Sequence, residues 1–121
     1  MEEKLKLYDA EYRLASIVWD NEPIHSRELA EKCAAELGWK RTTTYTMLKK
    51  LCDKGVLRND DAQVTARVKR AQIQRAESRE VVERSFGGSL PGFVASFLSE
   101  RTLSEEEAEE LRRLIESHRE G

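Results

Sequence analysis

Hydroxyl-bearing and cationic side chains gather between Gly38 and Gly55, where their spacing suits contact with a polyanion. A helix from Arg41 to Lys54 turns four residues to one side at the i, i+3, i+4, i+7 spacing of a buried stripe: Thr44, Met47, Leu48 and Leu51. The opposite side carries threonines and lysines, and no carboxylate precedes Asp53. Because a solvated helix face usually mixes both signs of charge, this face indicates contact with duplex DNA.

Four side chains of this helix are candidates for contacts with base edges. A threonine can hydrogen-bond a base and place its methyl group against that of thymine. Threonine is a mediocre helix former, so four threonines within five positions call for a further reason. The alternatives are threonines that merely occupy an exposed helix and a tyrosine that shields the edge of the core. The candidates are Thr42, Thr43, Thr46 and Tyr45.

Basic side chains around the same helix are candidates for contacts with phosphate. Residues 38–70 contain nine basic and three acidic residues, a net charge of +6, although the whole chain has a net charge of −2. A local basic surface of this kind binds phosphates, and the acidic remainder limits indiscriminate binding. For any single lysine the alternative is a solvated charged surface. The candidates are Lys40, Arg41, Lys49 and Lys50 and, on the segment that follows, Arg58 and Arg67.

Three helices followed by a β-hairpin are predicted to position these side chains. The expected elements are helices over 9–19, 26–37 and 41–54 and strands over 56–58 and 63–69. Gly38 and Gly55 supply the stops after the second and third helices, and residues 59–61 have turn chemistry. This order is that of a winged helix-turn-helix. We therefore predict a mostly α fold with a small β-hairpin and a DNA-binding domain over residues 1–71.

Residues 72–121 are predicted to form helices that pair two copies of the chain. Helices are expected over 75–86 and 91–99, and a last helix opens with the capping box of Ser104 and Glu107. Fifty residues with apolar stripes are too few to enclose a core alone. They could pack on the winged domain, but that domain closes on its own three helices, so a second copy is the expected partner. A twofold dimer would also suit a pseudo-palindromic DNA site. The expected dimerisation residues are Phe86, Leu90, Phe93, Val94, Phe97, Leu98, Leu111, Leu114 and Ile115.

Composition and motifs argue against an enzyme, a metalloprotein and a membrane protein. The chain has 121 residues, 36% of them charged, and shows no phosphate-binding loop, dinucleotide fingerprint or nucleophile–base motif. Cys33 and Cys52 lack the spacing of metal ligands and read as buried reduced thiols, and His25 and His118 are isolated. Neither a signal peptide nor a membrane-spanning run is found. We expect a cytoplasmic protein without cofactor or metal.

Several short motifs follow one another in an order that resembles a known family. Trp39 precedes the threonine-rich start of the third helix, Lys54-Gly55 closes it, and Phe86–Leu90 and Leu103–Leu111 lie further along. Together they resemble the penicillinase/methicillinase repressor family, of the BlaI, MecI and CopY type, over nearly the whole chain. The resemblance implies a homodimeric winged-helix transcriptional repressor that binds a pseudo-palindromic operator through the helix at about 41–54 in the major groove.

The resemblance also implies a route to induction. In the antibiotic-responsive branch of the family, a membrane sensor-protease pathway leads to cleavage within the dimerisation helices. The scissile Asn-Phe pair of the family aligns with Ser96 and Phe97, so the phenylalanine is kept and serine replaces asparagine. The expected partners are operator DNA, a second copy of the chain and such a sensor pathway.

Two other classes of function are weighed against DNA binding. Winged helices also serve as protein-interaction adaptors without sequence-specific DNA binding, but the third helix is then less basic than it is here. A small-molecule sensor would need a polar anchor in the C-terminal helices, and none is evident. Salt-dependent binding to duplex DNA separates the first alternative from a repressor.

Overall fold

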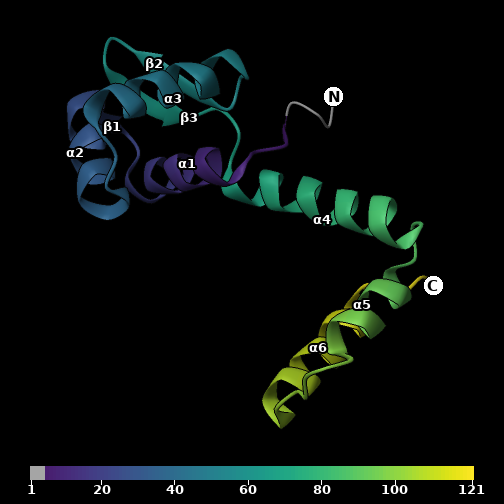
Figure 1. The fold of residues 1–121 in the computed structure, drawn as a ribbon. Helices are drawn as coiled ribbons and strands as arrows, with labels where there is room; N and C mark the ends of the chain where they lie inside the picture. Colours follow the sequence, from purple (N-terminus) through teal and green to yellow (C-terminus); the bar gives the residue numbers. More distant parts are fainter. Residues whose placement is uncertain (1–4) are drawn as a thin grey trace. The chain divides into compact units, whose positions relative to one another are not determined.

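Three helices and a small sheet occupy the first part of the chain in the computed structural model, which describes residues 5–121 (Figure 1). The elements are α1 (Asp9–Asn21), β1 (Ile24–His25), α2 (Ser26–Leu37), α3 (Arg41–Asp53), β2 (Leu57–Asp60) and β3 (Gln63–Ala66). They are followed by α4 (Arg70–Phe86), α5 (Leu90–Leu98) and α6 (Glu105–Ser117). The predicted mostly α fold with a winged helix-turn-helix is confirmed. Two compact units divide the chain, the first ending at Val81 and the second beginning at Val82.

Local signals at the helix ends explain most of the boundaries. The His25 imidazole accepts a hydrogen bond through Nδ1 from the backbone N–H of Arg27 (3.0 Å), which caps α2. Gly38 follows α2 with a φ of 70°, the left-handed conformation that glycine adopts without strain. α3 ends at Asp53, one residue before its predicted end, and α1 continues two residues beyond Trp19.

The sheet has one strand more than predicted, since β1 pairs with β3 to give the antiparallel order β1-β3-β2. β1 is only two residues long, too short for an alternating pattern to reveal. Asp60 pairs with Gln63, so Asp61 and Ala62 form the turn, and their φ angles of 50° and 71° are those of a type I′ turn. The prediction that residues 59 and 60 lie in the turn was therefore wrong, because they extend β2.

The second strand of the hairpin is shorter than predicted. β3 ends at Ala66, whereas the alternating pattern continues to Lys69. The backbone N–H groups of Arg67 and Val68 both bond to the carbonyl oxygen of Val56, at 2.9 and 3.1 Å. These bonds close the base of the hairpin and replace the regular ladder there.

The core of the first unit lies between the three helices and the sheet. Its fully buried side chains include Leu14, Leu29, Leu51, Val56 and Val64, and Ile73 joins them from α4. The half-buried side chains of Trp19 and Trp39 pack against this core. This packing fixes which side of α3 faces inward.

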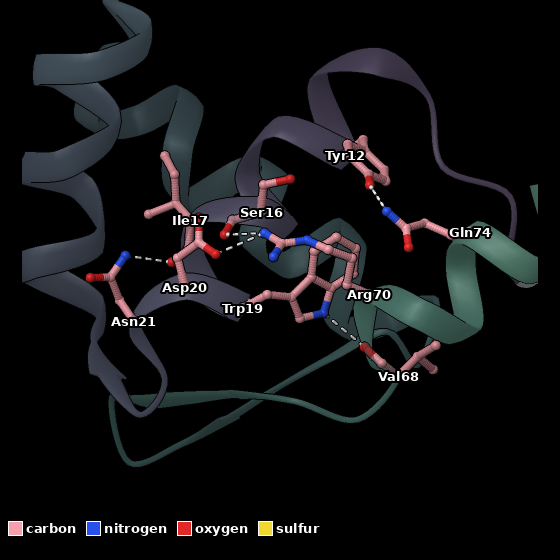
Figure 2. A network of polar contacts seen from close by, with 9 residues as sticks. All are labelled: Tyr12, Ser16, Ile17, Trp19, Asp20, Asn21, Val68, Arg70 and Gln74. Carbon is pink, nitrogen blue, oxygen red and sulfur yellow. Dashed lines mark hydrogen bonds and ion pairs between the residues drawn. The ribbon is translucent and has the colours of Figure 1, made fainter. Parts of the chain in front are cut away.

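α4 begins at Arg70, five residues before the predicted start, and its first turns are joined to α1 (Figure 2). Arg70 Nη2 donates to the carbonyl oxygen of Ser16 (3.3 Å) and to Asp20 Oδ1 (2.9 Å), and its guanidinium lies 5.2 Å from the centroid of the Trp19 ring. Trp19 Nε1 donates to the carbonyl oxygen of Val68 (2.9 Å). Helix α4 runs without a break across residues 71 and 72. The predicted division into a DNA-binding domain over residues 1–71 and a dimerisation region over residues 72–121 therefore describes two functions, and it stays a prediction.

The second unit contains no buried residue in the described chain from 82 to 121. Phe93 packs edge-to-face on Phe86, with ring centroids 5.4 Å apart, and also contacts Phe97. The predicted capping box opens α6, with Glu107 N donating to Ser104 Oγ at 3.1 Å. No helix in the part of the chain that the structure describes is long and apolar enough to cross a membrane.

Candidate nucleic-acid interface

α3 presents its hydroxyl groups to solvent and its apolar side to the core. Thr44, Leu48 and Leu51 are buried, and Met47 is half-buried. The four candidates for base contacts, Thr42, Thr43, Tyr45 and Thr46, are all exposed. The division between the two sides follows from the spacing of the apolar residues, which the core holds inward.

The six predicted phosphate contacts are exposed, but they differ in their partners. Lys49 Nζ lies 3.4 Å from Asp53 Oδ2 on the same helix, and Arg58 Nη2 lies 3.9 Å from Asp60 Oδ2 on β2. Pairs as exposed as these are weak, so both cations can exchange a carboxylate for a phosphate. Within the described residues, no ion pair is found for the remaining four: Lys40, Arg41, Lys50 and Arg67.

Three further cations of the segment 38–70 are neutralised by carboxylates of α1 and its neighbouring loop. Lys54 pairs with Glu11 (2.7 Å), Lys69 with Glu22 (3.1 Å) and Arg70 with Asp20 (2.9 Å). The sequence count of +6 takes no account of these partners, because they lie outside the segment that was counted. The basic surface is therefore concentrated around the first turn of α3, at Lys50 and at the base of the hairpin.

Glu11 is a charged residue that sequence reasoning missed, and its side chain is only 2% exposed. Its Oε1 accepts hydrogen bonds from the backbone N–H of Tyr8 (2.8 Å) and from Lys54 Nζ (2.7 Å). Burial alone would raise the pKa of Glu11, but these two hydrogen bonds and the charges of Lys54 and Lys50 outweigh it, so the pKa lies below its usual value. The signal in the sequence is a carboxylate on the apolar stripe of α1, at the spacing 11, 14, 15, 18.

The hairpin has an acidic tip that is bonded to the start of α2. The backbone N–H of Ser26 donates to the carbonyl oxygen of Ala62 (2.8 Å), and Asp60 and Asp61 are exposed beside this turn. Arg58 lies opposite Thr65 in the hairpin, and Arg67 lies at its base. Arg67 thus lies away from the acidic tip, whereas the Arg58 guanidinium lies beside Asp60.

The cysteines and histidines have structural surroundings. Cys33 is buried and Cys52 half-buried, both as free thiols, and burial is the main cause that raises the pKa of each. A thiol with a raised pKa is a poor nucleophile and a poor metal ligand at neutral pH. His118 follows α6 with Nδ1 2.9 Å from the carbonyl oxygen of Leu114. Across residues 5–121 no group of three potential metal ligands is found.

The predicted dimerisation residues line the helices of the second unit. Three of them, Phe86, Phe93 and Leu98, are half-buried within the unit. The other six are exposed, although all are large apolar side chains: Leu90, Val94, Phe97, Leu111, Leu114 and Ile115. Ser96 and Phe97, the pair aligned with the scissile bond of the family, are both exposed on α5.

The sequence is similar to that of known proteins over almost the whole chain. The sequence model of the family described as penicillinase repressor matches residues 7–117. The penicillinase repressor of Bacillus licheniformis is 27% identical over 118 residues, which cover 94% of this chain and 92% of that protein. The methicillin resistance regulatory protein MecI of Staphylococcus aureus strain N315 is 23% identical over 114 residues, covering 91% and 93%. The protein of the same name from Staphylococcus epidermidis is similar to the same extent.

Proposed function

Because the chain belongs to the penicillinase repressor family, we propose that it represses transcription as a homodimer that binds a pseudo-palindromic operator. The observation that carries this proposal is the exposed face of α3, where four candidate base contacts stand between cations and no carboxylate precedes Asp53. In a helix-turn-helix, the N-terminal part of the second helix enters the major groove. Thr42, Thr43 and Thr46 occupy that part of α3.

The cations for which no ion pair is found among residues 5–121 have a different role from these hydroxyl groups. Lys40 and Arg41 flank the start of α3, and Lys50 lies nearer its end. Contacts between such side chains and phosphates set position and salt-dependent affinity, whereas contacts between hydroxyl groups and base edges set sequence preference. Arg67 at the base of the wing reaches the backbone beside the groove.

Dimerisation is supported by what the second unit lacks. Forty residues without a buried side chain do not supply the hydrophobic burial that stabilises an independent fold. Six large apolar side chains are exposed on α5 and α6, and a second copy offers the same apolar surface for an isologous contact. Two winged domains then approach one dyad.

The genes under control and the release of repression are inferred from the relatives. Those relatives are named for a penicillinase and for methicillin resistance, so we infer that antibiotic-resistance genes are the targets. Cleavage between Ser96 and Phe97, through a sensor-protease pathway, would remove α6 and its apolar residues from the chain. Loss of that part of the dimer surface would release the operator.

A selection from randomised duplex DNA tests the proposal. Full-length protein should enrich a common sequence, bind it far more tightly than a shuffled duplex, and lose affinity steeply as salt rises. Binding that depends on salt but not on sequence would remove operator recognition. No binding to any duplex at low salt would favour the adaptor alternative.

A further inference from the structure

The end of α3 is fixed to the start of α1 by a charged contact that the DNA-binding face does not use. Lys54 follows the last residue of α3, and its Nζ donates to Glu11 Oε1 (2.7 Å) and to the carbonyl oxygen of Lys6 (3.3 Å). The same Nζ lies 5.1 Å from the centroid of the Tyr8 ring. A carboxylate, a carbonyl oxygen and an aromatic ring near the start of α1 therefore surround the ammonium group of Lys54.

Burial of the Glu11 carboxylate costs free energy, so this contact needs an explanation other than packing. Glu11 Oε2 is buried and has no hydrogen-bond partner in the described structure, while Oε1 is shared by two donors. Glu11 is buried, whereas the Lys54 side chain is 26% exposed. An ion pair with a desolvated carboxylate adds little to stability compared with apolar residues of the same size, but its hydrogen bonds impose a direction that apolar contacts do not. The pair thus supplies orientation.

Orientation of α3 matters because small rotations are magnified along a helix. A helix of 13 residues is about 20 Å long, so a tilt of about 5° at one end moves the other end by about 1.7 Å. A hydrogen bond keeps its strength only within roughly 0.5 Å. Phosphate contacts from long, flexible lysines tolerate such a shift, whereas threonine contacts to base edges do not.

We propose that Glu11 and Lys54 are positioning residues for sequence recognition, which set the angle of α3 and act through Thr42, Thr43 and Thr46. The inference rests on the proposed function. Under this proposal, the ion pair between Glu11 and Lys54 affects how well the protein discriminates the operator from other DNA. It does not affect the overall affinity for DNA. Lys54 is accordingly absent from the phosphate contacts.

The test compares Glu11→Gln, Lys54→Met and the double variant in the full-length chain. Glu11→Gln keeps an oxygen that can cap α1 but removes the charge. The probes are the duplex that the wild-type protein enriches from a random pool and the same duplex with its sequence shuffled. We expect the affinity ratio between these probes to fall about tenfold in each single variant and no further in the double variant. Affinity for the shuffled duplex and its salt dependence should stay unchanged.

Matched controls separate positioning from folding and from phosphate binding. Asp53→Asn breaks an exposed ion pair on the same helix and should leave the affinity ratio unchanged. Lys54→Arg keeps the charge and should restore most of the discrimination. Circular dichroism and urea unfolding verify that each variant is folded in the binding buffer, and if Glu11→Gln is not folded, Lys54→Met and Lys54→Arg carry the comparison.

Three results would overturn the inference. An affinity ratio like that of the wild type in folded Lys54→Met is one, and equal loss of affinity for both duplexes is another. The third is a slope of log affinity against log salt concentration that falls by about one unit in Lys54→Met but not in Glu11→Gln, because this would make Lys54 a phosphate contact. If the wild-type chain enriches no duplex, the proposed function fails instead, and the two failures are distinguishable.

Discussion

For some residues the sequence alone suggests a role, whereas for others the role depends on the residues that they contact in the fold. The threonines of α3 belong to the first group, because four of them within one turn and a half are unusual in a helix, and the three outward ones are exposed. Glu11 and Lys54 belong to the second group. An ion pair between residues 43 positions apart cannot be derived from local spacing, although a carboxylate on an apolar stripe points to it.

Thr46→Ala is expected to weaken binding to the enriched duplex by about 1–3 kcal/mol and to relax its sequence preference, because one hydroxyl and one methyl contact are lost. Titration against a series of single-base variants of the duplex measures both effects. The exposed Thr102, between α5 and α6, supplies the control Thr102→Ala. Unchanged discrimination in Thr46→Ala would remove this threonine from the base contacts.

The charge of Glu11 predicts how stability depends on pH. Its pKa in the folded chain lies below the usual 4.5, so its contribution is complete above pH 4.5 and is lost as the pH falls through the folded value. Glu11→Gln should therefore reduce the free energy of unfolding by about 1–3 kcal/mol at neutral pH. The difference from the wild type should shrink below pH 4.5. Urea unfolding across a pH series measures it, and a difference that stays constant down to strong acid would contradict this role.

Helices and strands were predictable to the extent that they carry periodic patterns or end signals. α2 has its predicted bounds, because an apolar stripe marks its length and Gly38 marks its end. The capping box of Ser104 and Glu107 opens α6 as expected. β1 was not predicted, because two residues are too few to show the alternation of apolar and polar side chains that marks a strand. α4 begins early because Gln72 Oε1 accepts from the backbone N–H of Lys69 (2.9 Å) and because Arg70 is held by α1, a tertiary contact without a local signal.

The conformation of the hairpin turn can be tested by substitution of Ala62. Ala62 has a φ of 71°, a conformation that disfavours a side chain with Cβ. Ala62→Gly makes the Asp-Gly pair that type I′ turns prefer and should stabilise the chain by about 1 kcal/mol. Ala35→Gly, in the exposed face of α2, should instead destabilise it by a similar amount. Thermal unfolding of both variants decides, and a destabilised Ala62→Gly would contradict the turn assignment.

The whole molecule combines a winged unit that closes its own core with a second unit that does not. Sequence reasoning predicted this contrast from the number of residues and their apolar stripes. It did not predict that α4 would begin within the first unit, where Ile73 is buried and Arg70 is bonded to α1. The start of α4 therefore belongs to the packed winged unit.

Leu114→Glu is expected to weaken self-association at least tenfold, because it places a charge on an apolar face that the proposed dimer would cover. Leu114 is 55% exposed in the single chain, so the fold of the winged unit should be unaffected. Sedimentation velocity over a concentration series measures the effect. Ser117→Glu, exposed on the same helix, is the control with the same added charge. Equal association of both variants would move the interface away from α6.

In the proposed complex, two chains bind one operator through paired α3 helices. Sedimentation equilibrium of the protein with the enriched duplex, and with the same duplex carrying one scrambled half-site, tests this arrangement. We predict an inverted repeat with centres about 10 base pairs or a multiple apart, two chains on each intact duplex and a large loss of affinity when one half-site is scrambled. A single bound chain with undiminished affinity for the scrambled half-site duplex would contradict the claim.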